Sequence, residues 1–194
     1  MGMRLPLILV LLLAGACSRP IVVSPPAEAV RLERQRQLLA TLRSLGEDGD
    51  WLVIRGYHGT DHLISAVTNA PFSHAALLDR ERDQVIEADH SGVHLTSLEA
   101  FAPKVHRLLL VRPIWARQGR NREALLKARG LVGRPYDFTG LVGINHPERY
   151  YCSELTVAAY RTWVKRSDHV PPVIPPSELH HWGRIIWDSG VPLE

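Results

Sequence analysis

The stretch RYYCSELTVAAY, residues 149–160, places Cys152 at the start of a predicted helix. Apolar residues recur along it at helical spacing, and the expected inward face is Leu155, Ala158, Ala159 and Trp163. The 194-residue chain has one other cysteine, Cys17, which follows a short apolar segment. The role of Cys152 therefore depends on the fate of Cys17 and on the side chains that surround the Cys152 thiol.

The N-terminus, MGMRLPLILVLLLAGACSRP, combines one positive charge, an apolar run from Leu5 to Leu13 and small residues ending at Cys17. The run is too short to span a bilayer comfortably and has the length of a signal-peptide core. LAGAC resembles the lipobox of bacterial lipoproteins, which implies a signal peptide over 1–16, a lipidated Cys17 and a Pro-rich tether over 17–29. Ser18 suits outer-membrane sorting, so we expect a lipid-anchored protein of the bacterial envelope that faces the periplasm. The alternative is an ordinary secretory signal cut nearby.

The composition suits one globular domain over residues 30–194. Hydrophobic residues make up 45% of the chain and charged residues 22%, which is enough apolar material for one packed core. The net charge is only +3 and no run of Lys and Arg with interleaved aromatics occurs, so no nucleic-acid partner is expected. With Cys17 acylated, Cys152 has no disulfide partner, and is a buried spectator, an intermolecular bridge or a reactive thiol. The oligomeric state stays open.

Residues 27–45 predict an amphipathic helix that packs on the domain. Its apolar stripe consists of Leu32, Leu38, Leu39, Leu42 and Leu45. Gln35 and Arg36 interrupt this stripe. The other positions mix charges of both signs, which favours packing on the protein over lying on a membrane surface.

The rest of the chain predicts an antiparallel sheet with packed helices. Strands are expected at 49–56, in a hairpin over 72–89, at the start of 92–101 and over 104–114. Helices are expected from a Thr60 cap through 61–70, over 121–133 with Gly133 at the end, and over 150–164. Residues 134–149 predict a Gly- and Pro-rich loop, and 170–190 a short helix and a last strand. The sum is one α+β domain.

A cysteine attacks as its thiolate, which a helix N-terminus, a histidine base and a polar group orienting that histidine all favour. Of ten histidines, only His74 begins a strongly apolar strand, SHAALLD, where the sheet would hold its ring rigid. A hairpin turn centred on Arg80 and Glu81 would place Glu87 opposite His74, and a turn one residue later would place Asp89 there. We take Glu87 first and Asp89 second as the orienting acid.

Four stretches carry a family resemblance: FSHAALL at 72–78, VIEADHSGV at 85–93, GRPYD at 133–137 and YYCSEL at 150–155. Together they resemble the circularly permuted branch of the NlpC-type papain-like cysteine hydrolases, the YiiX/YaeF-type permuted papain-like amidases. Ordinary NlpC-type domains place the nucleophile helix before the strands, whereas here the strands come first. The resemblance, over residues 49–177, implies a permuted papain-like fold with Cys152 as nucleophile, His74 as base and Glu87 as the orienting residue.

The oxyanion formed during acyl transfer needs hydrogen-bond donors, most simply the Cys152 backbone N–H and a nearby side chain. Tyr57 and Tyr151 are the candidates for that side chain. Tyr136, in GRPYD, is a candidate for the cleft wall, although a turn in which Asp137 bonds its own backbone explains the motif as well.

The spaced histidines His90 and His94 lack a supporting ligand set, so we expect no metal, and nothing calls for a cofactor.

The leading function is a cysteine amidase or peptidase that forms a thioester, with cell-wall stem peptides as the expected substrate because of the envelope location. The alternative is a thioester-forming lipid or ester hydrolase, or an acyltransferase of the lecithin–retinol acyltransferase type. A third class is a binding module that kept the fold without catalysis, against which the intact set of Cys152, His74 and Glu87 argues.

Overall fold

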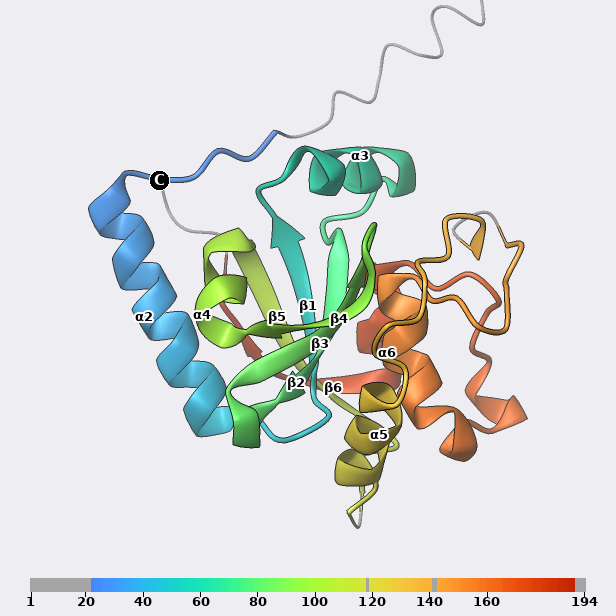
Figure 1. Cartoon of the computed structure of the whole chain (residues 1–194). Coiled ribbons are helices and arrows are strands. Elements are labelled where there is room, and N and C mark those ends of the chain that lie inside the picture. Colours follow the sequence, from blue (N-terminus) through green and yellow to red (C-terminus); the bar gives the residue numbers. More distant parts are fainter. Residues whose placement is uncertain (1–21, 118, 141–142, 191–194) are drawn as a thin grey trace, which may run out of the picture.

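Six strands and five α-helices make up the part of the chain that the computed structural model describes, residues 22–117, 119–140 and 143–190 (Figure 1). The strands are β1 (Trp51–Gly56), β2 (His74–Asp79), β3 (Gln84–Asp89), β4 (Gly92–Ser97), β5 (Val105–Pro113) and β6 (Gly183–Asp188). The helices are α2 (Glu28–Leu45), α3 (Gly59–Thr68), α4 (Leu98–Phe101), α5 (Arg120–Arg129) and α6 (Cys152–Tyr160). Short 3-10 turns are η1 (Arg80–Arg82), η2 (Ala102–Lys104), η4 (Arg161–Trp163), η5 (Arg166–Asp168) and η6 (Pro176–Trp182).

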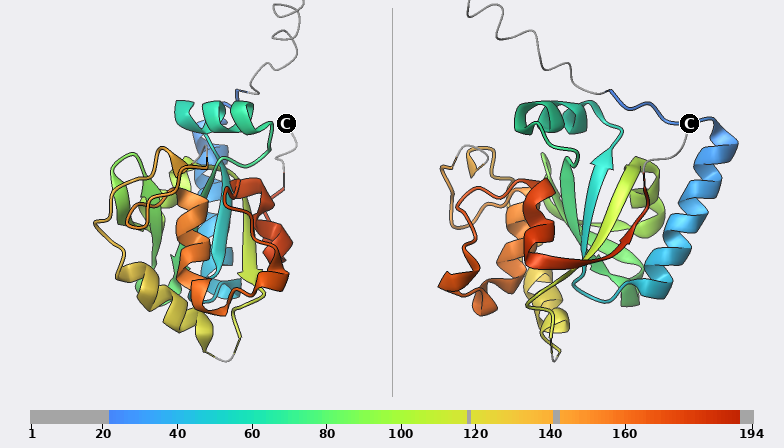
Figure 2. Two further views of the ribbon diagram at one scale, coloured as in Figure 1. Left: turned by 90° about the vertical axis from the view of Figure 1, so that its right-hand side faces the viewer. Right: turned by 180° about the vertical axis from the view of Figure 1, so that it is seen from behind.

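The strands form one sheet in the order β4-β3-β2-β1-β5-β6, and every neighbouring pair is antiparallel. Helices α2 and α4 cover one face of this sheet, whereas α5, α6 and η6 cover the other (Figures 1 and 2). Helix α3 lies across the end of the sheet at which β1 finishes and β2 begins (Figure 1). The predicted α+β fold with an antiparallel sheet is therefore confirmed.

Strand β1 shows why the sheet is covered on both sides. Trp51 and Val53 belong to the core beneath α5 and α6, and Leu52 and Ile54 belong to the core beneath α2. Successive side chains of a strand point to opposite faces, so an unbroken apolar run needs cover on each face. The central position of β1, between β2 and β5, satisfies this need.

Two helix ends, the start of α3 and the end of α5, differ from the sequence prediction. Helix α3 starts at Gly59 with His58 as its N-cap, not Thr60, because the Asp61 carboxylate accepts the His58 backbone N–H at 3.1 Å. Helix α5 ends at Arg129 and is capped by Gly130, and the predicted end Gly133 instead donates its N–H to the Val93 carbonyl of β4 at 2.8 Å. Long-range backbone pairing, which periodicity does not report, moved this end.

Helix α6 is shorter and more deeply buried than the sequence predicts, ending at Tyr160 where the turn η4 begins. Leu155 and Ala159 are buried as expected, but Ala158 is only half-buried. Val157 and Tyr160 are buried as well. The helix lies between the sheet, α5 and the segment that leads to η6, so more than one stripe meets the core.

Helix α2 matches the predicted bounds to within one residue, but its predicted stripe packs only in part. Leu38 and Leu42 are buried against the sheet, whereas Leu32 and Leu45 are 41% and 46% exposed. The C-terminal half of the helix therefore supplies most of its apolar packing.

We expect Leu42→Ala to lower the free energy of unfolding by about 2–5 kcal/mol, because it leaves a cavity under a fully buried side chain. The matched control on the same helix, Leu32→Ala, should change it by less than about 0.5 kcal/mol. Denaturant unfolding of both variants measures the difference. Equal effects would show that α2 does not pack through Leu42.

Candidate active site

Cys152 is the first residue of α6, where the helix meets the beginning of β2. Its side chain is buried, with 3% of the residue exposed. The sulfur lies within hydrogen-bonding reach of the backbone N–H groups of Ala75 and Ser153. Unpaired N–H groups and the partial positive charge of a helix N-terminus favour an anion at this position. Local geometry therefore already favours a thiolate.

His74, the first residue of β2, lies between the thiol and a carboxylate. Its Nε2 is 2.8 Å from Glu87 Oε2, and the ring is also hydrogen-bonded to the side chain of Cys152. Because Nε2 faces Glu87, Nδ1 is the nitrogen left to exchange a proton with the sulfur. The three side chains thus form a continuous chain of hydrogen bonds, from α6 through β2 to β3.

The strand register behind this arrangement differs from the one first expected. Strands β2 and β3 pair Ala76 with Glu87, since the connection runs through η1 and a left-handed Asp83, with φ of 54°. The turn is therefore one residue later than the turn that would place Glu87 opposite His74. Glu87 reaches His74 as a diagonal neighbour on the same face, which is within range for long side chains.

Asp89, the second choice for the orienting acid, faces a different set of groups. Its carboxylate accepts hydrogen bonds from the backbone N–H and the hydroxyl of Ser91, at 2.8 and 2.6 Å. It also lies 3.7 Å from His94 Nδ1. The contact to His74 belongs to Glu87 alone among these two acids.

Glu87 is almost fully buried and has several partners besides His74. Its Oε1 accepts hydrogen bonds from the Thr96 hydroxyl at 2.6 Å and from the Lys104 ammonium at 2.9 Å, and it lies 3.5 Å from His94 Nε2. These partners were not predicted from the sequence. His94 is directly opposite Glu87 in the β3–β4 pairing, so the short turn between these strands could have indicated His94 and Thr96. Lys104 comes from η2 and had no sequence signal.

The pKa values of the three groups shift in directions that favour charge separation. Burial raises the pKa of the Cys152 thiol, but the hydrogen bond and charge of His74, together with the backbone N–H groups of Ala75 and Ser153, outweigh burial and lower the net pKa. Burial lowers the pKa of His74, yet its bonds to Cys152 and Glu87 raise it to about 10. Burial likewise raises the pKa of Glu87, and its bonds to His74 and His94 bring it well below the usual range. These directions all favour a thiolate beside an imidazolium and a carboxylate.

The chain just before His74 is held by a buried polar network. Ser73 donates its hydroxyl to Asp61 at 2.7 Å and accepts the Gly56 backbone N–H at 3.1 Å. Gly56 permits this closeness, because a Cβ there would collide with the Asp61 carboxylate. The network joins the end of β1, the first turn of α3 and the start of β2, and so fixes the backbone that carries His74.

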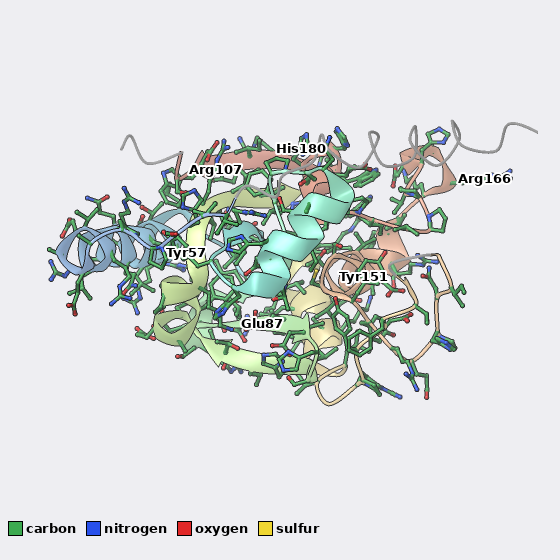
Figure 3. The ribbon with its side chains drawn as sticks, turned by 90° about the horizontal axis from the view of Figure 1, so that it is seen from above. Tyr57, Glu87, Arg107, Tyr151, Arg166 and His180 are labelled. Atoms are coloured by element: carbon green, nitrogen blue, oxygen red, sulfur yellow. The ribbon has the colours of Figure 1, made fainter. Side chains whose placement is uncertain are left out.

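The three tyrosines that the sequence predicted near Cys152 have different surroundings in the structure. Tyr136 lies close enough to Cys152 for the thiolate charge to help raise the pKa of its phenol, after burial. Tyr151 is also beside Cys152, but its hydroxyl accepts the Ile174 backbone N–H at 2.9 Å and so anchors the 170–174 segment. Seen from above, Tyr57 lies towards α2 and Tyr151 towards α6, with Glu87 between them (Figure 3). Tyr57 packs edge-on against His106, which corrects its assignment to the surroundings of Cys152.

The GRPYD motif owes its shape to Asp137. This fully buried carboxylate accepts the backbone N–H groups of Thr139, Gly140 and His146 at 2.9–3.0 Å. Burial raises its pKa, but these bonds outweigh that effect and lower it. The expected backbone-bonded turn is present, and it presents Tyr136 to the core beside Cys152.

A cavity of about 550 Å³ opens next to His74, between the N-terminus of α3 and the hairpin β2–β3. Most of its described lining residues have polar side chains, although apolar atoms form the larger part of the lining surface: Ile54, His58, Gly59, Thr60, Asp61, His74, Glu87, Asp89, His90 and Lys104. The cavity gives small polar molecules access to the imidazole.

Among the described residues, no three or more His, Cys, Asp and Glu side chains are grouped so that they could hold a metal ion. His90 and His94 instead contact Asp89 and Glu87. Within the same ranges no helix has the length and apolar character needed to cross a membrane. Cys17 and the predicted signal peptide lie outside the described residues.

A model of the permuted papain-like amidase enzymes, the YaeF/YiiX or C92 family, matches residues 48–170. The chain belongs to this family. The match contains both the strands that carry His74 and Glu87 and the helix that begins at Cys152. This permuted papain-like protein is therefore a cysteine amidase or peptidase that acts on amide-containing substrates.

Among solved structures, the metalloprotein YiiX from Escherichia coli O157:H7 matches with a TM-score of 0.51 and 19% sequence identity. The match covers 68% of this chain and 78% of YiiX, and it shows the shared fold. No curated protein matches the chain.

Alkylation of Cys152 should report the paired thiolate directly. In the full chain, we expect faster alkylation between pH 6 and 8 than for an ordinary thiol, because the lowered pKa enlarges the thiolate fraction. His74→Ala removes the hydrogen bond and the charge of the imidazole while burial still disfavours the anion, so the thiolate fraction at pH 6.5 should fall at least about tenfold. Peptide mass spectrometry separates Cys152 from Cys17. A slow wild-type rate that follows an ordinary thiol pKa would contradict the pairing.

Replacing Glu87 should change the titration of His74, whereas replacing Asp89 should not. Loss of a charged hydrogen bond in Glu87→Gln is expected to lower the His74 pKa by about one to two units. Asp89→Asn is the matched control, since that carboxylate faces Ser91. NMR titration of the His74 ring measures both. A larger shift in Asp89→Asn would reverse the assignment of the orienting acid.

Proposed function

We propose that Cys152, His74 and Glu87 form the catalytic triad of a thiol amidase that works through a thioester. The observation that carries the proposal is the His74 ring, which is hydrogen-bonded to the Cys152 thiol on one side and to Glu87 on the other. A nucleophile, a base and a group that orients the base are the parts that acyl transfer needs. Glu87 acts as the positioning residue, because its carboxylate is hydrogen-bonded to the imidazole and takes no part in bond making at the substrate carbonyl.

The first half-reaction would start from the thiolate–imidazolium pair. Cys152 Sγ forms a bond to the substrate carbonyl carbon, and the carbonyl oxygen takes up the negative charge. As the C–N bond breaks, the proton on His74 Nδ1 moves to the leaving amine, which departs neutral. The acyl group then remains on Cys152 as a thioester.

In the second half-reaction water attacks the thioester while His74 accepts its proton. The carbon–sulfur bond breaks, the acid product leaves, and the thiolate–imidazolium pair is restored. The carboxylate of Glu87, held by Lys104 and Thr96, keeps the imidazolium oriented during both steps. Its contribution is electrostatic and needs no proton transfer of its own.

The oxyanion would be stabilised by donors that are already near Cys152. The Cys152 backbone N–H lies in the first turn of α6, where helix geometry leaves N–H groups unpaired. The Tyr136 hydroxyl is the better side-chain candidate, since Tyr151 is bonded to Ile174. No hydrogen bond to another described residue occupies the Tyr136 hydroxyl.

The polar cavity next to His74 supports a peptide substrate more than an acyl chain. His58, His90 and Lys104 offer positive or hydrogen-bonding groups, and Asp61 and Asp89 offer negative ones. Cell-wall stem peptides carry free carboxylates and amines as well as amide bonds, and they fit such a lining. The signal segment and Cys17 would anchor the protein by lipid in the bacterial envelope, facing the periplasm where these peptides occur.

Hydrolysis of muropeptides in H₂¹⁸O tests this function. We expect the full-length protein to release an amine and to place one ¹⁸O in each new carboxylate, because water resolves the thioester. Cys152→Ser should lose at least about a thousandfold in rate, as other enzymes do when their nucleophile is removed. Cys17→Ser, assayed in detergent, is the control for the anchor and should keep the activity.

Phospholipids are assayed in parallel with the muropeptides. Transfer of a lipid acyl chain to an added amine or alcohol, without ¹⁸O uptake, would favour the acyltransferase or lipid hydrolase alternative. A slow, pH-independent reaction of Cys152 with every substrate would favour a binding module instead.

A further inference from the structure

The first half of α2 turns polar side chains towards the domain. Arg31, Arg34 and Gln35 are partly buried at positions that continue the face of Leu38 and Leu42 towards the N-terminus. Residues three and four apart share one face of a helix, so an apolar stripe would normally occupy these places. Gln35 marked the same interruption in the sequence. Basic residues therefore take the positions where packing alone would select leucine.

A cavity of about 250 Å³ lies under these residues, between α2, η2 and the strands β5 and β6. The donors that face it include Arg31, Arg34, Tyr57, His106 and Ser189. No Asp or Glu occurs among its described lining residues. The cavity is therefore rich in donors and lacks a protein anion.

Two residues that line this cavity each have a buried nitrogen with no hydrogen-bond partner among the described residues. These nitrogens are Arg31 Nε and His106 Nδ1. Native proteins rarely leave buried polar atoms unpaired, because each costs desolvation energy without compensation. The Arg34 guanidinium lies within reach of the Tyr57 hydroxyl, which is neutral at physiological pH, so its charge also lacks a counterion there.

Other arginines of α2 show the contrast. Arg36, on the solvent side, pairs with Glu33 at 3.1 Å, and Arg43 pairs with Asp83 and Glu99. No ion pair joins Arg31 or Arg34 to a described acidic residue. The helix therefore neutralises the arginines that face solvent or the hairpin, whereas the two cavity arginines have no acidic partner among the described residues.

We propose that this cavity binds a phosphoryl group, as a phosphate ester or as the phosphodiester of a lipid headgroup. Two guanidinium groups, an imidazole and two hydroxyls supply more donors than one carboxylate can accept, whereas phosphate oxygens accept them all. The volume is slightly below that of drug-sized sites, which suits a phosphoryl group with a small substituent.

The site is separate from the cavity beside His74, and the two share a wall. Tyr57 and Val105 line the basic cavity, whereas the adjacent His58 and Lys104 line the other one. The Tyr57 backbone N–H donates to the Lys104 carbonyl at 3.1 Å and closes the wall between them. The donors of the basic cavity make no contact with Cys152 or His74. A variant can therefore lose ligand binding in the basic cavity and keep amidase activity, or lose amidase activity and keep ligand binding.

Calorimetric titration of the full chain in detergent tests the site, with inorganic phosphate and glycerol 3-phosphate as probes at constant ionic strength. Saturable binding is expected for at least one of these soluble probes, or for phosphatidylglycerol vesicles that are added after the detergent has been removed. The double variant Arg31→Gln/Arg34→Gln should weaken it at least about tenfold, since each charged hydrogen bond contributes roughly that factor. The matched control Arg36→Gln, on the outer side of the same helix, should bind like the wild type.

The probes separate the sources of the phosphoryl group. Binding of the soluble phosphates indicates a free ester, whereas binding only to phosphatidylglycerol vesicles, and not to phosphatidylcholine ones, indicates an anionic headgroup. Acetate that binds as tightly as phosphate, or equal loss in Arg36→Gln, would overturn the proposal. So would the absence of saturable binding by every phosphoryl probe.

Arginine modification by phenylglyoxal provides a readout in the wild-type chain that does not depend on the folding of a variant. The bound probe should protect Arg31 and Arg34 and leave Arg36 reactive. Equal labelling of all three arginines with and without the probe would contradict the site.

Discussion

The hydrogen bond between His74 and the buried carboxylate of Glu87 is the interaction on which the candidate site depends. A carboxylate with so little exposure would normally take up a proton, because burial disfavours its charge. Here His74, His94, Thr96 and Lys104 surround it with donors and positive charge. These contacts lower the pKa of Glu87, and the hydrogen bonds of His74 to Cys152 and Glu87 raise the pKa of the imidazole. The charged imidazolium in turn favours the thiolate of Cys152.

The fold brings these groups together by packing and not by their order in the chain. Helix α6 lies against β2 and β3 so that its first residue meets the first residue of β2. Loops connect α6 to the rest of the chain, so this helix can come after strands β1 to β5 in the sequence and still pack against β2. The polar network of Ser73, Asp61 and Gly56 fixes one side of this meeting point, and the Asp137 turn fixes the loop on the other. The side chains of Cys152, His74 and Glu87 thus meet although α6 follows the strands in the chain.

The cavity beside His74 and the cavity under α2 differ in how buried charge is compensated. Beside His74, each charged side chain of the hydrogen-bonded chain has a partner within the protein. Under α2, Arg31 and His106 each have a buried nitrogen with no partner among the described residues. Because a packed core of the same volume could have been built from leucine, as it is around Leu38 and Leu42, the basic lining represents a cost in stability. A bound anion is the physical reason we assign to it.

The sequence by itself determined the α+β class, the approximate positions of most strands and helices, and the pairing of a helix-start cysteine with a strand-start histidine. These features depend on local periodicity and on the order of short motifs, which neighbouring residues encode. Only the tertiary structure decided the β2–β3 register, because one residue in the turn shifts every cross-strand pair. It also brought Lys104 to Glu87, moved Tyr57 away from Cys152 and placed the α2 arginines over a cavity. Such contacts join residues far apart in the chain, and no local pattern reports them.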